Sequence, residues 1–392
     1  MKNSKLPKKN ACISCKNCIN ICKHKAITIK TDFLGNRYPF INNNRCTNCG
    51  LCEKVCPILS IQKLKNDNII SVQACIAEKT ILMNSASGGF ATQLSEIAIE
   101  KKAIVVGAAF TNYPSCNHII VENKDNLRKL KGSKYVYSEL NDVMPQLALL
   151  QKKEKTIIFI GLPCQVAAAK SYLKNEKSTY FIDLLCHGTC PNFIFEKYNN
   201  YLSWRLKSKV INYNFRGQKE WKGYNVFQNP IAQTMDNHLH LLYKWDKWFL
   251  TSFLNGRAYY KRCYHCKFVG KQRVGDITIG DFWGIGVKIP FSKDTKYGIS
   301  AVLINNNKGE YLFNIVKDRL AFYEERSYEE LAENNQTLTA ATPIPHFNII
   351  YHIMLKILPT KLLLLLHIFI YYSEKIIFSL KWRFQYLIKI CK

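Results

Sequence analysis

The sequence lacks the features that direct a protein into or across a membrane. Its first residues, "MKNSKLPKKN", are basic and lead straight into cysteines, with no apolar stretch and no small-residue cleavage site. The apolar run from Leu362 to Tyr372 has eleven residues and is interrupted by His367, whereas a helix that spans a bilayer needs about twenty. We therefore expect a cytoplasmic protein without a membrane-spanning helix.

Acidic residues are scarce as well. The 392 residues include 28 Asp and Glu against 56 Lys and Arg, which gives a formal net charge of +28. Such a surplus is typical of proteins that meet nucleic acid, anionic membranes, or anionic cofactors and partners. The basic residues form no dense block, and no helix-turn-helix, zinc-finger or RNA-binding signature accompanies them. We therefore expect no nucleic-acid partner.

Cysteine, by contrast, is abundant. The chain has 16, and because a reducing cytosol opposes disulfides, metal ligation or redox chemistry is the expected use. Eight of the cysteines form two local runs with the same C-x2-C-x2-C-x3-C spacing, the second followed by Pro57: Cys12, Cys15, Cys18 and Cys22, then Cys46, Cys49, Cys52 and Cys56.

This spacing is that of two-cluster bacterial ferredoxins, in which three close thiolates and a fourth from the other run hold each 4Fe-4S cluster. We predict one cluster on Cys12, Cys15, Cys18 and Cys56 and a second on Cys46, Cys49, Cys52 and Cys22. Structural zinc and a disulfide scaffold are the alternatives. Between the two runs, residues 26–41 alternate apolar residues around Gly35 and Asn36, which predicts a small hairpin.

A polar linker, Lys63–Asn68, leads out of this module into a longer region. Residues 84–110 predict a turn, a helix and a strand, and the "SASGGF" turn before the helix could bind an anion. The loop "KLKGSKYVYS", residues 129–138, would suit a pyrophosphate. An ordinary helix cap and a solvated basic turn are the respective alternatives.

Four more cysteines lie in predicted turns of three separate segments. Cys164 and Cys186 each follow an apolar strand, and Cys263 and Cys266 form a CxxC pair. Ligands bind at the carboxyl ends of strands in open α/β sheets, so these four thiols could complete a third 4Fe-4S site. A zinc site or unpaired structural cysteines remain alternatives. The remaining cysteines are unassigned, since such residues are more often small buried hydrophobes than ligands: Cys75, Cys116, Cys190 and Cys391.

Seven segments between Ser85 and Gly284 together resemble the coenzyme F-420 hydrogenase/dehydrogenase beta-subunit family: "SASGGF", "KGSKYVYS", "GLPCQVAA", "DLLCHG", "NFRGQKEW", "KRCYHCKF" and "DITIGDFWG". The resemblance implies an iron-sulfur flavoprotein that passes electrons among a 4Fe-4S cluster, FAD and a hydride-exchanging partner. It implies that the cluster is held by Cys164, Cys186, Cys263 and Cys266. It also implies a flavin site at Ser87, Gly88, Gly89, Lys131, Gly132, Ser133 and Lys134, with Asp281 nearby.

These observations predict an oxidoreductase in which 4Fe-4S clusters and FAD exchange electrons with a partner protein and with an organic substrate or coenzyme. A deazaflavin is one candidate, and bacterial family members suggest a polysaccharide-related pathway. His187 directly follows a predicted ligand, so it is a candidate proton relay, or it supports the cysteine loop by a hydrogen bond. The alternative function is a non-catalytic electron-transfer subunit that docks on a larger or membrane-bound complex.

The expected fold is a multidomain mixture of α+β and α/β architecture. We predict a two-cluster ferredoxin-like domain at 1–66, an N-terminal family region at 67–155, a C-terminal family region with flavin and third cluster at 156–348, and a basic amphipathic helical tail at 349–392. Residues 351–392 carry seven Lys or Arg against one Glu. The tail either makes peripheral contact with an anionic membrane or packs as a helical hairpin on the enzyme.

Overall fold

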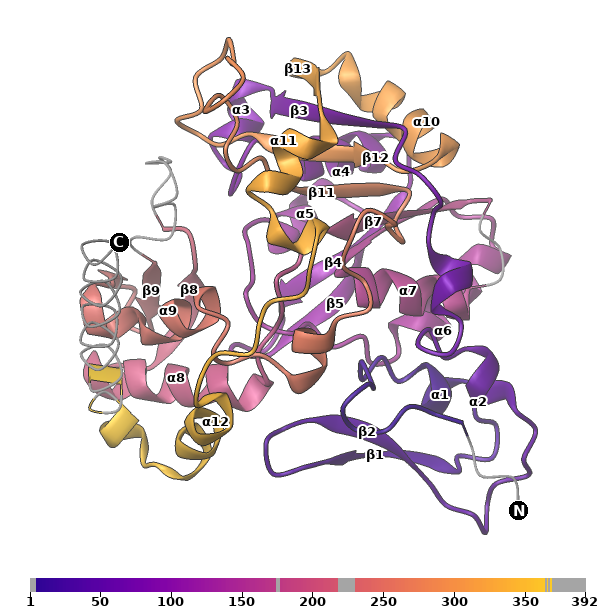
Figure 1. The fold of residues 1–392 in the computed structure, drawn as a ribbon, viewed down its shortest axis with the longest axis vertical. Helices are drawn as coiled ribbons and strands as arrows, with labels where there is room; N and C mark the ends of the chain where they lie inside the picture. The colour runs from indigo at the N-terminus through magenta and orange to yellow at the C-terminus, as the bar shows by residue number, and fades with distance from the viewer. Residues whose placement is uncertain (1–4, 174–176, 218–229, 364, 366, 369–392) are drawn as a thin grey trace, which may run out of the picture.

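A computed structural model describes residues 5–173, 177–217, 230–363, 365, 367 and 368 (Figure 1). Its α-helices are α1 (Asn17–Asn20), α2 (Leu51–Lys54), α3 (Lys79–Leu82), α4 (Phe90–Glu100), α5 (Lys124–Leu127), α6 (Val143–Lys152), α7 (Pro163–Tyr172), α8 (Asn192–Arg205), α9 (Trp248–Leu254), α10 (Asn307–Lys317), α11 (Tyr328–Glu333) and α12 (Asn348–Ile357). Short 3-10 helices include η1 (Ile61–Leu64) and η4 (Lys261–His265).

The strands are β1 (Ile27–Thr31), β2 (Arg37–Ile41), β3 (Ser71–Ala77), β4 (Ile104–Phe110), β5 (Cys116–Val121), β6 (Ile157–Gly161), β7 (Thr179–Leu184), β8 (Val210–Asn214), β9 (Ile231–Thr234), β10 (Leu239–Leu241), β11 (Ile277–Asp281), β12 (Ser300–Ile304) and β13 (Leu320–Arg326). They form a two-stranded, a three-stranded and an eight-stranded sheet. The expected mixed α/β architecture behind an N-terminal ferredoxin-like region is therefore present.

The N-terminal module is small and is built around its hairpin. Strands β1 and β2 pair antiparallel, from Ile27 opposite Ile41 to Thr31 opposite Arg37, which confirms the predicted hairpin. Each cysteine run leads into a one-turn helix, α1 or α2. The module lies at the lower end of the molecule in Figure 1, next to α6 and α7 of the large domain.

The eight-stranded sheet has the order β13-β3-β12-β11-β7-β6-β4-β5. Its central strands β4, β6, β7 and β11 are parallel, and the flanking strands are each antiparallel to their neighbours. Strand β3 immediately follows the N-terminal module, yet it lies inside the sheet, between β12 and β13. Strands from both predicted family regions, 67–155 and 156–348, thus share one sheet.

The central strands are buried on both faces, and their side chains alternate between two cores. Ile157 and Phe159 of β6 pack with α6 and α7, whereas Ile158 between them packs with α4 and α10. Phe181 and Ile182 of β7 divide in the same way. Because a strand projects successive side chains to opposite faces, this run of apolar residues requires helices on both sides of the sheet.

A further, aromatic core lies beside the large sheet. It forms where α8, α9 and the sheet β10-β9-β8 come together, with Phe195 of α8 at its centre. The Phe195 ring lies 5.0 Å from that of Phe249 and 5.7 Å from that of Phe215. This unit is the lobe on the left of Figure 1.

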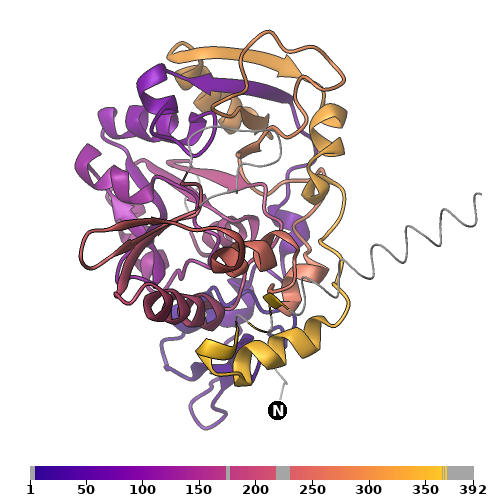
Figure 2. The ribbon, with the colours of Figure 1, turned by 90° about the vertical axis from the view of Figure 1, so that its left-hand side faces the viewer.

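The start of the predicted tail packs on this lobe. In α12, the hydroxyl groups of Tyr351 and Ser252 share a hydrogen bond at 2.6 Å, and the main-chain oxygen of Leu355 accepts one from Lys197 of α8 at 2.7 Å. His367 stacks on Trp248 with ring centres 4.2 Å apart. Figure 2 shows α12, in yellow, along the lower end of the molecule. The part of the predicted tail from 369 to 392 lies outside the described residues, so the membrane alternative stays a prediction.

Within the described residues, no helix combines the length and apolar character that crossing a membrane requires.

Candidate functional site

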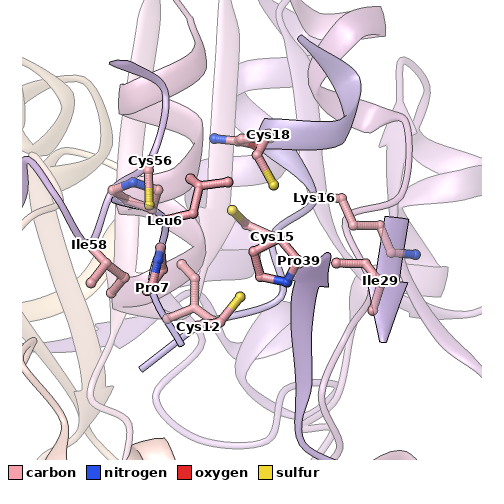
Figure 3. Close-up of a pocket in the computed structure, with 13 residues that line it drawn as sticks. Leu6, Pro7, Cys12, Cys15, Lys16, Cys18, Ile29, Pro39, Cys56 and Ile58 are labelled. Carbon is pink, nitrogen blue, oxygen red and sulfur yellow. The ribbon is translucent and has the colours of Figure 1, made fainter. Parts of the chain in front are cut away.

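The first predicted thiol set comes together at the contact between the N-terminal module and the large domain. Cys12, Cys15 and Cys18 from the first run and Cys56 from the second line one pocket, whose other walls include Leu6, Pro7 and Ile58 (Figure 3). The contact itself is hydrogen-bonded: Asn17 donates to the Ala168 carbonyl at 2.7 Å, and Tyr137 donates to the Ile13 carbonyl at 2.7 Å.

Backbone geometry repeats between the two cysteine runs. In the first run Ser14 and Lys16 have φ of 60° and 65°, and the matching positions of the second run, Asn48 and Gly50, have φ of 54° and 73°. Left-handed backbone costs a residue with a Cβ about 1 kcal/mol or more. Its recurrence at the same places in both runs indicates that the fold maintains this turn to set the direction of the thiols.

The raised pKa values of these thiols indicate that they need a cationic group between them in order to ionise together. Burial raises the pKa of Cys15 well above its ordinary value, and burial together with negative charge on Cys12 and Cys56 raises that of Cys18 to about 12. Four such neighbours could not all ionise without positive charge between them. The iron of a 4Fe-4S cluster supplies that charge, and thiolate is its usual ligand, so the donor set fits the predicted cofactor.

The second predicted set is nearer the surface. Cys22, Cys46 and Cys52 are half-buried and Cys49 is exposed. Burial raises the pKa of Cys52, with a smaller contribution from the neighbouring Cys49. Cys22 accepts a 3.4 Å hydrogen bond from the Ala26 N–H. This assignment stays a prediction.

The third predicted set is assembled from three separate segments. Cys164 lies in the first turn of α7, Cys186 follows β7, Cys263 lies in η4, and Cys266 ends that turn. Burial is the main cause that raises the pKa of Cys164 to about 12, with the charge of Arg262 opposing the rise and the Cys266 and Cys263 thiols contributing to it. Burial also raises the pKa of Cys186, with smaller contributions from the charges of Cys263, Cys164 and Cys266. The thiols of this set thus influence one another's pKa, and their assignment to a shared cluster stays a prediction.

In the part of the chain that the structure describes, no three His, Cys, Asp or Glu side chains are placed to hold a single metal ion.

A large cavity of about 540 Å³ adjoins the third set, and Cys186 belongs to its wall. It lies at the carboxyl ends of the parallel strands, where Gly161 ends β6, Leu184 ends β7 and Asp281 ends β11. This is the usual ligand position in an open α/β sheet, and the volume is within the usual range for small-molecule sites. The first turns of α4 and α7 also border it.

Most of the predicted cofactor residues line this cavity: Ser87, Gly89, Lys131, Gly132, Ser133, Lys134 and Asp281. Gly88 lies behind them. A Cβ on Gly88 would come within 2.2 Å of the Ser300 nitrogen and 2.5 Å of the Cys75 oxygen, so glycine lets this loop pack against the sheet. Gly88 therefore shapes the turn that presents its neighbours to the cavity.

The two lysines of the "KGSK" loop already have protein partners. Lys131 forms an ion pair with Glu96 at 3.1 Å. The Lys134 ammonium donates to the carbonyls of Leu130, Lys131 and Gly132 at 3.3, 3.0 and 3.2 Å, and burial lowers its pKa to about 8. Lys134 thus holds the loop in shape as well as placing positive charge at the cavity.

Two family models match parts of the chain. Residues 11–58 match the family model of the 4Fe-4S dicluster domain. Residues 154–328 match the model that describes the C terminus of the beta subunit of coenzyme F420 hydrogenase/dehydrogenase. Over residues 154–328 the chain is similar to the C terminus of that beta subunit, which confirms the resemblance seen in the sequence. The two matches together support an iron-sulfur electron-transfer protein.

Among solved structures, a chain of the F420-reducing NiFe hydrogenase complex from Methanosarcina barkeri matches with a TM-score of 0.45 and 18% sequence identity. The match covers 69% of this chain and 86% of that chain. No curated protein matches significantly.

The sequence analysis assigned no role to Arg216, which lies in the segment "NFRGQKEW". Its guanidinium pairs with Asp281 at 2.6 and 3.2 Å and also donates to the Tyr135 hydroxyl and the Ala86 carbonyl, at 2.8 and 2.9 Å. Arg216 therefore ties together three segments of the cavity wall, and Asp281 serves as its counter-ion. The sequence signal that could have identified Arg216 is its place in a segment that resembles the family.

Two histidines border the cavity. His187, the predicted catalytic residue, lies in its wall, and burial lowers its pKa. His118, which no sequence pattern singled out, is buried and bonded to the Ser138 hydroxyl at 2.8 Å and to the Ile160 carbonyl at 3.2 Å. Burial lowers the pKa of His118 to about 4, so it is neutral at physiological pH.

Proposed function

We propose that the protein is an iron-sulfur flavoprotein oxidoreductase, with three 4Fe-4S clusters on the three thiol sets and FAD in the 540 Å³ cavity. The observation that carries the proposal is the position of Cys186, which belongs both to the third thiol set and to the cavity wall. Bound FAD would supply the conversion between one-electron transfer and two-electron hydride chemistry.

The residues around the cavity are suited to a dinucleotide. The first turns of α4 and α7 border it, and neither turn carries an acidic residue. With Lys131 and Lys134 alongside, this end of the cavity would bind a pyrophosphate. The ion pair of Arg216 and Asp281 holds the opposing loops together. We also propose His187 as the group that exchanges a proton at this wall.

The second thiol set would serve a protein partner. Cys49 is exposed, and the nearby Lys23, Lys25 and Arg45 are exposed as well. A basic surface around an accessible cluster favours a partner with an acidic face. We propose that electrons enter or leave here, and that the small-molecule partner, with a deazaflavin as one candidate, uses the cavity. A polysaccharide-related pathway remains part of this proposal.

Anaerobic purification tests the proposal. The protein should contain about twelve iron atoms per chain and one FAD that is released on denaturation. Ser133→Glu should lose most of the FAD and keep its iron, because a carboxylate would repel the pyrophosphate at this wall. Ser133→Ala is the matched control and should keep both. If Ser133→Glu binds FAD like the natural protein, the flavin is not in this cavity.

The alternative, a non-catalytic relay subunit, makes a different prediction in the same experiment. It requires iron without flavin, and the exposed surface around Cys49 is compatible with it. Full iron with no releasable FAD would therefore favour the relay. A folded sample without iron would exclude both functions.

A further inference from the structure

Arg262 lies buried between two of the three thiol sets. It directly precedes Cys263 in η4, and only 8% of its surface is exposed. Its positive charge acts on Cys12 of the first set and on Cys164 of the third, and in each case it favours the thiolate. A single guanidinium thus acts electrostatically on a thiol of the N-terminal module and on one of the large domain.

The guanidinium is held in place by aromatic rings. Its centre lies 3.7 Å from the ring centre of Tyr260 and 5.1 Å from that of Tyr137. Tyr137 in turn bonds to the Ile13 carbonyl of the module, so this stack spans the domain contact. Stacking fixes the plane of an arginine but leaves its edge free for anions.

The edge of Arg262 lacks hydrogen-bond partners. Both of its terminal nitrogens, Nη1 and Nη2, are buried without an acceptor in the described part of the chain. The neighbouring Arg37 differs, because it forms an ion pair with Glu139. Burying an unpaired charge is strongly unfavourable, so a buried guanidinium without acceptors points to an anionic group that completes the site. The thiols on either side of Arg262 are the groups that could become anionic.

We propose that Arg262 is a positioning residue that acts as a shared counter-charge for two iron-sulfur clusters, the one on Cys12, Cys15, Cys18 and Cys56 and the one on Cys164, Cys186, Cys263 and Cys266. This inference rests on the proposed function, since it requires both clusters. Reduction adds one negative charge to a cluster, and a fixed cation nearby favours that form. Arg262 therefore raises both reduction potentials together.

Redox titration of the full-length, iron-loaded protein, followed by electron paramagnetic resonance, tests this role. Arg262→Gln should lower the ratio of reduced to oxidised cluster at a fixed potential by about tenfold, a shift of about 59 mV for a one-electron couple. The shift should affect two of the three clusters and leave the surface cluster unchanged. Arg319→Gln removes the same group from a site paired with Glu100, 43% exposed, and should move none.

Arg262→Lys separates charge from packing. This variant keeps the positive charge but loses the planar stack. For both clusters, the ratio of reduced to oxidised cluster at a fixed potential should therefore stay within about threefold of its value in the natural protein. If Arg262→Gln keeps its iron and shifts neither potential, or shifts only one, the shared role is wrong. If Arg262→Gln loses its iron, Arg262→Lys decides: retained iron supports the need for charge, and lost iron means that Arg262 serves packing. Natural protein without iron would refute the proposed function instead.

Discussion

The N-terminal module and the eight-stranded domain are stabilised in different ways. Among the described residues of the module, the buried hydrophobic side chains are Cys12, Ile13, Cys15, Ala26, Ile27 and Cys56, of which half are cysteines. The large domain instead buries leucine, isoleucine, valine and aromatic side chains on both faces of its sheet. The comparison indicates that the module depends on its cofactors for its structure, whereas the large domain depends on its apolar cores.

The strongest test of this difference is removal of iron. We expect the amides of β1, β2, α1 and α2 to lose protection from hydrogen exchange by about 100-fold or more, because a small metal-held domain folds around its metal. The amides of β4, β6 and β7 should stay protected. Hydrogen exchange with mass spectrometry reports both regions in one sample. A module that keeps its protection without iron would contradict the comparison.

A core truncation should produce the reverse pattern. Phe195→Ala removes a fully buried ring from the aromatic core, and we expect a loss of about 3–5 kcal/mol in the free energy of unfolding. Urea unfolding followed by tryptophan fluorescence measures it. Leu149→Ala, at a side chain 58% exposed, is the control and should cost less than about 0.5 kcal/mol. Iron in the N-terminal clusters should be unaffected by either change.

The contact between the two regions should respond more moderately. Glu139 pairs with Arg37 of the module and approaches Lys16 at 3.7 Å. Glu139→Gln leaves the partly buried Arg37 unpaired, at a cost of about 2 kcal/mol, less than for a fully buried pair. Exchange rates in residues 13–17 and 137–141 should rise. The control is Lys288→Ala, which breaks an exposed pair with Glu333 and should cost less than about 0.5 kcal/mol.

The smallest effect concerns pH and the large domain alone. The pKa of His118 is about 4 in the folded protein, because burial disfavours its charged form, and about 6.5 when unfolded. Between these values the unfolded chain binds more protons, so stability is complete above pH 6.5 and falls as the pH drops toward 4. From pH 7.5 to 5.5 the loss should be about 1 kcal/mol.

His118→Gln should remove that contribution. The measurement is the urea unfolding free energy of both proteins at the two pH values. An equal pH dependence in both would mean that the pKa of His118 is the same in the folded and unfolded states.

The sequence predicted best the features that are encoded locally. The cysteine spacing, the hairpin between the runs, and the strand, turn and helix around Cys164 all depend on residues a few positions apart. Hydrophobic period and turn residues are sufficient for such elements. For the third thiol set the sequence left a zinc site and unpaired cysteines open as alternatives, because folding must bring together Cys164, Cys186 and the pair at 263–266.

Features that depend on distant pairs were missed. Arg216 and Asp281 are 65 positions apart, and nothing near either residue indicates the other. The same holds for Arg262, whose significance comes from thiols of two domains, and for His118, whose burial is decided by the sheet. The place of β3 between β12 and β13 was equally inaccessible, since strand order depends on tertiary packing.

The insertion of β3 limits how this protein can be rearranged. The chain leaves the N-terminal module and within a few residues becomes an interior strand, with main-chain bonds to neighbours on both sides. The N-terminal module could therefore be replaced only up to Asn66. The side chain of Asn66 anchors the linker by donating to the carbonyls of Arg273 and Gly275 at 3.0 and 2.7 Å. A different N-terminal domain could be grafted before Asn66, whereas a cut beyond Ser71 would divide the sheet.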